Sequence, residues 1–445
     1  MSVTVATPGA AEPDIGPEGG GSEQALDRFL TALQPRIMGP RLAEALGLTP
    51  TACHVLDAKY LPGVGATVLY SLGGQLLRAD VGGGPRDAGS RDNGVGALGM
   101  SIHPFPDDPD LPSLRRVMDP SMLGPSLDAA LRSSSGTLTS GPRRCRTTLL
   151  RYRPGKRATV LVEQLGRRNR YVAKAYHDVT KAAAVARESD ALTSVGAETS
   201  ELRFAAMAAH LPDLGVVVQR EVAGTPLTAL VGASHGPAAG ASAGVRRAAR
   251  ALAELHQVGP ATDRHRSVHR ELRRFSERSA RVTEVAPEVG AALEALAARL
   301  ADCGMQLPPP QLGTVHGDCK PSQFVLGRHV HLLDVDHLGV SDLAADVGTF
   351  LASLRQQGAR RRLSRRAGAP AWAYDELAAE FLREYLVVRG VGTAQLPRIR
   401  WQEAVALERK ALRAFGRAPC SPLPLALIAL AHRQLDIMGG RHGKA

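Results

Sequence analysis

The sequence has few aromatic residues and few cysteines. Phe, Trp and Tyr make up 4% of the 445 residues, and the five cysteines form no CxxC pair. An odd cysteine count without that spacing argues against a disulfide framework and against a structural zinc site. The formal net charge is +12, but the basic runs are not interleaved with aromatic residues that could stack on bases. We therefore predict a protein of a reducing cytosol that has no nucleic acid as its partner.

Long apolar runs are also missing. None approaches the roughly 20 residues that a membrane span needs. Residues 1–22 are rich in Gly, Pro and acidic residues, and they lack the basic flank and apolar stretch of a secretory signal. We expect them to form a disordered tail. The sequence thus predicts a cytoplasmic protein without a membrane partner, and it leaves the oligomeric state open.

The length exceeds what one hydrophobic core usually organises, so we expect several structural units. Apolar residues at helical spacing predict a helix from about Ser22, which Pro35 ends. A β-rich stretch follows from about His54 to Val81, with turn signals at Pro62-Gly63 and at the later glycine pair. We assign these elements to an N-terminal α/β extension with a β-hairpin, residues 23–140.

Three further strands are predicted at residues 148–152, 158–165 and 170–176, and they form an antiparallel meander. An internal echo supports the first hairpin of this meander. Ala58–Tyr70 matches Leu150–Val162 at Tyr, Pro, Gly, Ala, Thr, Val and Leu. The first copy shows no following counterpart to the strand at 170–176. We therefore interpret it as a structural hairpin and not as a second active site.

From Asp178 onward the apolar pattern becomes mostly helical, as at 179–195 and 245–256. A small β-rich unit followed by a larger helical unit predicts an α+β architecture with a cleft between the two. We place the small antiparallel β-rich N-lobe at 141–222. The mainly helical C-lobe follows at 223–445.

Three oxygen-bearing side chains stand out between Thr314 and Phe350. Asp318 and Gln323 share one predicted loop, and Asp334 follows a hydrophobic strand. Carboxylate and carboxamide oxygens are hard ligands that suit Mg²⁺ together with substrate phosphates. We expect Thr314-Val315 and 330–333 to pair as strands and so bring both acids to one end. Two carboxylates placed together repel each other unless a cation or a shared proton lies between them.

These residues carry a family resemblance. HGDCKPSQ, from His316 to Gln323, resembles the HGDxxxxN catalytic loop of the aminoglycoside phosphotransferase and choline kinase family. LLDVD resembles the metal-binding stretch of that family, about 16 residues further on. The likeness covers roughly residues 147–440. It implies a bilobal protein-kinase-like fold and a kinase that moves the γ-phosphoryl group of ATP, or alternatively of GTP, to a hydroxyl group with the help of Mg²⁺.

The resemblance also implies roles for the residues that match. Asp318 would accept or orient the proton of the substrate hydroxyl, and His316 would brace the catalytic loop. Gln323 and Asp334 would hold magnesium against the nucleotide phosphates. Asp336 remains an alternative to Asp334 as metal ligand.

Further residues would bind the nucleotide. Lys174 would contact the α- and β-phosphates, and Glu188 would be its ionic partner. The chain departs from the family pattern in having Gln for Asn in the loop and no GxGxxG sequence. In its place the basic turn at 153–157 could bring the Gly155 amide or Lys156 over the phosphates.

The acceptor is not fixed by these motifs. A sugar, an amino alcohol, an antibiotic or another secondary metabolite fits, and the basic composition favours a neutral or anionic acceptor over a polycationic aminoglycoside. Two alternatives remain. One is a Ser/Thr kinase that acts on a biosynthetic peptide docked on residues 23–140, and the other is a catalytically weak kinase fold that serves as a binding or regulatory module. Asp346 is expected to bond backbone groups near the catalytic loop.

Overall fold

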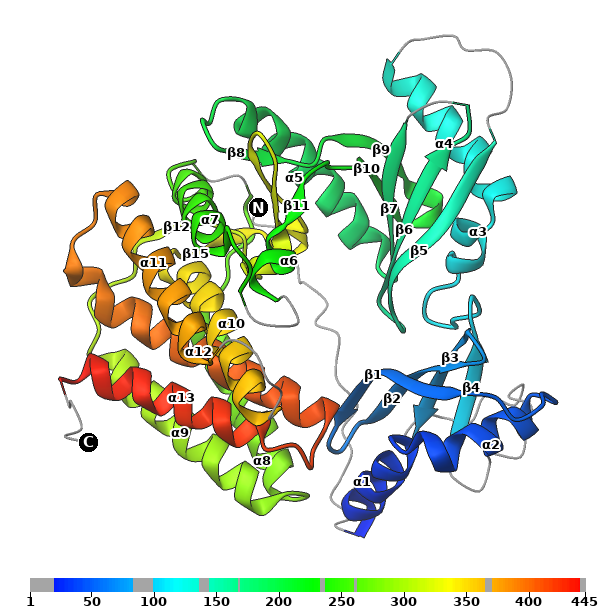
Figure 1. Ribbon diagram of the computed structural model, residues 1–445, viewed down its shortest axis with the longest axis horizontal. Helices are drawn as coiled ribbons and strands as arrows, with labels where there is room; N and C mark the ends of the chain where they lie inside the picture. Colours follow the sequence, from blue (N-terminus) through cyan, green and yellow to red (C-terminus); the bar gives the residue numbers. More distant parts are fainter. Residues whose placement is uncertain are drawn as a thin grey trace, which may run out of the picture.

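The computed structural model describes residues 20–82, 99–135, 144–166, 169–232, 237–259, 262–364 and 370–440. The disordered tail predicted for residues 1–22 lies outside this set, except that residues 20–22 open the first helix. Figure 1 shows an N-terminal extension in blue, a β-rich lobe in cyan and green, and a helical lobe in green to red. The predicted α+β class, with a small antiparallel lobe, a larger helical lobe and an extra N-terminal part, is confirmed.

The extension contains two helices and one antiparallel sheet. Its elements are α1 (Gly20–Ala32), α2 (Pro35–Ala45), β1 (Cys53–Leu61), β2 (Gly65–Leu72), β3 (Gln75–Val81) and β4 (Met100–Pro104), with strand order β1-β2-β3-β4. The predicted β-rich stretch and its turns are confirmed. The prediction that Pro35 ends the first helix is wrong in detail, because Pro35 opens α2. Proline suits that position since the first helical residue needs no N–H donor.

The echo between the two β-rich units extends further than the sequence indicated. β3 pairs with β2 as a third strand, so the first copy does have a counterpart to the strand at 170–176. Thr67 lies opposite Asp80 in the first copy, whereas Thr159 lies opposite Lys174 in the second. An acid therefore occupies the lysine position of the first copy, which agrees with a structural role for that meander.

The N-lobe is a five-stranded antiparallel sheet in the order β5-β6-β7-β10-β9. Its strands are β5 (Cys145–Arg153), β6 (Arg157–Gln164), β7 (Arg170–Tyr176), β9 (Met207–Leu211) and β10 (Val216–Arg220), and its helices are α3 (Leu114–Met118), α4 (Pro120–Ser135) and α5 (Val179–Ala197). Ala173 and Ala175 pack against α3 and α4 in one apolar cluster, whereas Tyr176 joins the cluster on the α5 side. Because side chains alternate along a strand, Lys174 faces the same side as Tyr176.

The C-lobe is built mainly from helices. They are α6 (Leu227–Val231), α7 (Ala241–Leu255), α8 (Val268–Thr283), α9 (Pro287–Met305), α10 (Ala344–Leu363), α11 (Trp372–Arg389), α12 (Leu396–Arg417) and α13 (Leu423–Met438). Short strands β11 (Thr225–Pro226), β13 (Phe324–Leu326), β14 (Val330–Leu332) and β8 (Leu202–Phe204) form one sheet in that order. Single 3-10 turns lie at Pro212–Leu214, Pro321–Gln323, Val335–His337 and Thr393–Gln395. Within the described part of the chain, no helix combines the length and apolar character that crossing a bilayer demands.

The strand pairing predicted near the catalytic loop is wrong. β12 (Leu312–Val315) pairs with β15 (Gly339–Asp342) and not with 330–333. β14 pairs instead with β13 and with β8. β13 and β14 are consecutive in the chain and form a hairpin, which leaves β12 to pair with the later strand β15.

The extension shares a hydrophobic core with the C-lobe. The rings of Phe29 and Tyr60 stack at 5.1 Å, and Tyr60 lies 6.4 Å from the ring of Phe415 on α12. A Cβ atom on Gly416 would lie 2.7 Å from the carbonyl oxygen of Tyr60, so glycine is required for this close approach of α12 to β1. The predicted extension, 23–140, thus spans two packing units, since its α3 and α4 cover the N-lobe sheet.

Candidate active site

The catalytic loop begins where β12 ends. Asp346, buried in the first turn of α10, accepts hydrogen bonds from the backbone amides of His316 (2.6 Å) and Gly317 (2.8 Å). The expectation that Asp346 bonds backbone beside this loop is confirmed. Gly317 has φ of 77°, and a Cβ atom there would lie 2.2 Å from the carbonyl oxygen of His337. Glycine is therefore required directly before Asp318.

His316 braces this loop from the inside. Its side chain is fully buried, with Nε2 at 2.8 Å from the carbonyl oxygen of Leu333 and Nδ1 accepting from the Asp318 amide at 3.3 Å. A carbonyl can only accept and an amide can only donate, so the ring is neutral and carries its proton on Nε2. The ring thereby ties the loop of Asp318 to the residue before Asp334.

The structure brings four predicted site residues together. Nε2 of Gln323 lies 3.4 Å from Oδ2 of Asp318 and 3.5 Å from Oδ2 of Asp334. Nζ of Lys174, on the face of β7 that also carries Tyr176, lies 3.5 Å from Oδ1 of Asp334. The loop, the residue after β14 and the N-lobe lysine therefore meet at one point between the lobes.

Arg157, at the start of β6, is a site residue that the sequence analysis missed. Its guanidinium lies 2.7 and 3.1 Å from the two carboxylate oxygens of Asp334, and it also forms an ion pair with buried Asp336. Burial would raise the pKa of Asp334, but Lys174 and Arg157 outweigh it and hold that pKa well below its ordinary value. The strand register contained the signal, because Arg157 lies opposite Tyr176 and so shares a face with Lys174.

Asp318 is ionised at neutral pH. Burial would raise its pKa, but the neighbouring Lys320 and Arg413 lower it to about 2. Lys320 forms an ion pair with Oδ2 of Asp318. The carboxylate is therefore a strong hydrogen-bond acceptor and a weak proton acceptor until a substrate rearranges these contacts.

The predicted ion pair between Lys174 and Glu188 is wrong. Glu188 accepts a hydrogen bond from Thr262 Oγ1 at 2.9 Å and forms an ion pair with Arg264, both in the C-lobe. Each charge thus has a different partner, since Lys174 pairs with Asp334. Glu188 on α5 connects the N-lobe to the C-lobe.

The predicted phosphate contact of the Gly155 amide is also contradicted. That amide donates to the carboxylate of Asp108 at 2.7 Å. Asp108 is buried and needs donors, which it finds in Gly155, in the Tyr152 hydroxyl at 2.7 Å and in Arg78. The turn is therefore fastened to the extension. Lys156 is exposed, and its contact with a phosphate stays a prediction.

A comparison with protein families decides what this site belongs to. The model of the phosphotransferase enzyme family matches residues 150–385, which is more than half of the chain. The chain belongs to this family. It is accordingly a phosphotransferase with an alcohol group of a small molecule as acceptor, and of the resemblance stated for roughly 147–440 the part from 150 to 385 is confirmed. The described residues 20–135 and both helices after 395 lie outside the matched range.

Other comparisons give distant likenesses. No curated protein matches the chain. An aminoglycoside-3'-phosphotransferase of type VIII is 18% identical, with a TM-score of 0.41 over 64% of this chain and 98% of that one. A choline/ethanolamine kinase family protein from Mesorhizobium loti is 16% identical, with a TM-score of 0.41 over 72% and 95%. A choline kinase from Streptococcus pneumoniae is 11% identical, with a TM-score of 0.44 over 69% and 96%.

The donor set of the family site fits a hard divalent cation. Two carboxylates, Asp318 and Asp334, lie within 3.5 Å of Nε2 of one carboxamide, and carboxylate and carboxamide oxygens are the ligands that Mg²⁺ prefers. Across the described ranges, no group of three or more His, Cys, Asp or Glu side chains is placed to hold a metal ion. The third ligand type here is the amide of Gln323, which matches Mg²⁺ better than zinc.

Proposed function

We propose that the protein transfers the γ-phosphoryl group of ATP to a hydroxyl group of a small molecule, with Mg²⁺ as cofactor. The observation that carries the proposal is the convergence of Asp318, Gln323, Asp334 and Lys174, in which successive side-chain atoms lie 3.4 to 3.5 Å apart. The family match and the buried loop that aims Asp318 at this point support it.

The proposed reaction moves the γ-phosphoryl group from ATP to the acceptor hydroxyl. The hydroxyl oxygen of the acceptor forms a bond to the γ-phosphorus, and the bond from that phosphorus to the β,γ-bridging oxygen breaks. The electron pair leaves with ADP, and the hydroxyl proton passes to the carboxylate of Asp318. Because the transition state is loose, a carboxylate of low pKa is a sufficient base for this reaction. Asp318 orients the hydroxyl first and takes its proton late.

The remaining residues position charge. Gln323 and Asp334 would hold magnesium, which neutralises the β- and γ-phosphate oxygens when bound. Lys174 would bind the phosphates from the N-lobe side. Arg157 fixes the orientation of Asp334 through its two hydrogen bonds.

The test measures ADP release across a panel of hydroxylated metabolites, with ATP and with GTP. We expect Asp318→Asn to lower kcat by about 100-fold or more while thermal stabilisation by AMP-PNP and Mg²⁺ is kept. Asp302→Asn, an exposed aspartate on α9, is the matched control and should behave as the wild type.

Two outcomes would redirect the proposal. Nucleotide-dependent stabilisation without turnover of any acceptor would favour the catalytically weak binding module. Two features support this alternative: Gln323 stands where the family has Asn, and Arg157 already occupies Asp334. Turnover only with Ser- or Thr-containing peptides would favour the peptide kinase. Absence of both nucleotide binding and turnover would refute the proposal outright.

A further inference from the structure

Helix α12 places three basic side chains beside the catalytic loop. They are Arg409, Lys410 and Arg413. Nζ of Lys410 donates to Ser353 Oγ at 3.0 Å and to Gln356 Oε1 at 3.4 Å, both on α10. Within the described residues, neither Lys410 nor Arg413 forms a salt bridge with a carboxylate.

Three more cations reach Asp318 from other elements. Lys320 pairs with Asp318 directly. Arg266 donates to the carbonyl oxygen of His337 at 2.8 Å and packs so closely on Gly317 that a Cβ atom there would lie 2.5 Å from its Nη1. Arg153, at the end of β5, acts electrostatically on both Asp318 and Arg413. We call Arg153, Arg266, Lys320, Arg409, Lys410 and Arg413 the cationic cluster.

The acids near this cluster do not balance it. Glu271 on α8 pairs with Arg409 at 3.0 Å, and Asp318 pairs with Lys320. Glu408 is buried beside Arg409, but desolvation raises its pKa to about 8, so it is neutral at pH 7. Burial and the neighbouring cations in turn lower the pKa of Lys410 to about 7. The cluster therefore carries positive charge that the protein itself leaves uncompensated.

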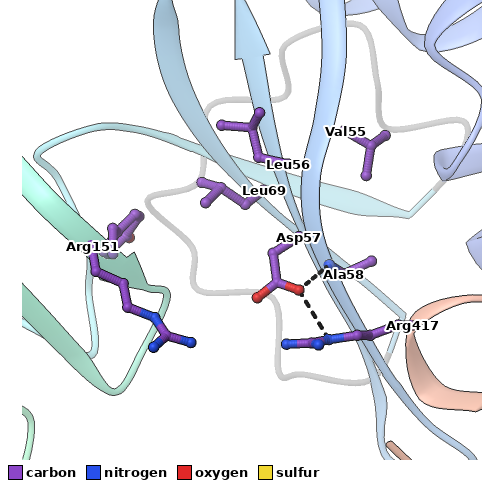
Figure 2. Close-up of a pocket in the computed structure, with 8 residues that line it drawn as sticks. Val55, Leu56, Asp57, Ala58, Leu69, Arg151 and Arg417 are labelled. Carbon is purple, nitrogen blue, oxygen red and sulfur yellow. Dashed lines mark hydrogen bonds and ion pairs between the residues drawn. The ribbon is translucent and has the colours of Figure 1, made fainter. Parts of the chain in front are cut away.

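The cationic surface continues away from Asp318 into a pocket. Arg417 follows Arg413 by one helical turn, and Arg151 precedes Arg153 by two strand positions, steps of about 6 to 7 Å in each element. Arg151 and Arg417 line a pocket of about 530 Å³ together with β1 and β2 of the extension. Figure 2 shows their guanidinium groups on either side of Asp57, which pairs with Arg417 at 3.3 Å.

The extension side of the pocket is apolar except for Asp57. Val55, Leu56 and Leu69 line it there, while β5 and α12 supply its two arginines, of which Arg417 is paired with Asp57. Arg151 has no salt bridge in the described part of the chain. An elongated ligand with its reacting end at Asp318 could thus meet positive charge along two elements and apolar contacts from a third.

We propose that the phosphoryl acceptor is an alcohol that already carries a phosphate or carboxylate group, held by the cationic cluster with its free hydroxyl at Asp318. This inference rests on the proposed function. In the reaction the hydroxyl oxygen bonds the γ-phosphorus, ADP leaves with the electron pair of the broken bond, and Asp318 takes the proton. The cluster serves the acceptor and not ATP, because its members Lys320 and Arg413 act directly on Asp318, whereas the carboxylate of Asp334 is already paired with Lys174 and Arg157.

The first experiment compares matched acceptors at saturating ATP: glucose, gluconate and glucose 6-phosphate, and glycerol, glycerate and glycerol 3-phosphate. We expect kcat/KM to be at least tenfold higher for the anionic members, and the two kinds of anion separate phosphate from carboxylate recognition. Arg413→Gln should raise the KM for the anionic acceptor about tenfold with a smaller change in kcat, and Arg413→Lys should restore most of it. Arg433→Gln, an exposed arginine on α13, is the control.

A binding measurement keeps the inference testable if no alcohol in the panel reacts. Inorganic pyrophosphate is titrated calorimetrically into protein whose nucleotide site is filled with AMP-PNP and Mg²⁺. We expect binding that weakens with salt and falls at least tenfold in Arg413→Gln but not in Arg433→Gln. Equal affinity in both variants, preference for the neutral alcohols, or an effect of Arg413→Gln confined to the KM for ATP would overturn the inference. Failure of AMP-PNP to stabilise the wild type would instead refute the proposed function.

Discussion

Asp108 is the residue at which the extension holds the N-lobe turn, and its removal should show how strong that connection is. The side chain is fully buried and accepts from the Tyr152 hydroxyl, the Gly155 amide and the Asp110 amide at 2.7, 2.7 and 3.0 Å, and it pairs with Arg78. Breaking a buried ion pair costs about 3 to 5 kcal/mol, and each buried donor left unsatisfied costs about 1 to 3 kcal/mol.

These contributions do not add fully in Asp108→Ala. Arg78 keeps ion pairs with Asp80 at 2.8 Å and Asp110 at 2.6 Å, so its charge is not left alone. We therefore expect the free energy of unfolding to fall by about 4 kcal/mol. Since Gly155 lies between Arg153 and Arg157, the loosened turn should also raise the KM for ATP.

The assay is urea unfolding at constant pH, combined with nucleotide titration. Asp107→Ala is the matched control, because Asp107 is exposed and pairs only with exposed Arg115. That variant should lose less than about 1 kcal/mol. If Asp108→Ala were as stable as Asp107→Ala, the reasoning that this buried carboxylate fastens the extension would be refuted.

Three further predictions concern charge in the C-lobe and the site. The pKa of Glu408, ordinarily near 4.5, is raised to about 8 by desolvation, so the stability that its neutral form contributes is present below pH 4.5 and is lost as the pH rises toward 8. In urea unfolding, wild type should thus lose up to about 1.4 kcal/mol per pH unit relative to Glu408→Gln between pH 5 and 8, and parallel pH profiles would contradict this. Arg157→Gln leaves Asp336 without its cation and Asp334 with Lys174 alone, and it should lower the free energy of unfolding by about 3 kcal/mol. Mg²⁺ should raise the melting temperature of that variant more than that of wild type. Equal shifts in melting temperature would disprove competition between Arg157 and Mg²⁺ for Asp334. Gln323→Ala removes an amide that lies 3.4 to 3.5 Å from both carboxylates, so the Mg²⁺ concentration for half-maximal activity should rise roughly tenfold; an unchanged value would exclude Gln323 as a ligand.

The sequence predicted those parts of the site that depend on local spacing. The loop from His316 to Gln323 and the acid 16 residues after Asp318 form a continuous stretch with short strands between them, so few arrangements are open to them. Lys174 was predictable because the meander fixes its register. The helical and antiparallel parts of the two lobes followed from apolar periodicity for the same local reason.

Partners far apart in sequence could not be predicted in this way. Glu188 has a carboxylate on a helix face that could reach several cations, and only the packing of α5 on the C-lobe selects Arg264. Asp108 reaches Gly155 across 47 positions from an irregular segment. The wrong pairing of β12 has a similar origin, since two short apolar strands carry too little pattern to specify their neighbours.

The extension contacts the two lobes through interfaces of different kinds. Toward the C-lobe the interface is apolar and closely packed. The carbonyl of Tyr60 lies against Gly416, and the ring of Tyr60 packs between those of Phe29 and Phe415. Toward the N-lobe the interface combines hydrogen bonds centred on the carboxylate of Asp108 with a smaller apolar cluster, in which the ring of Phe105 lies 5.2 Å from that of Tyr152. The apolar interface with the C-lobe is the larger of the two, so β1 and β2 should stay with α12 when the cleft widens to release its product.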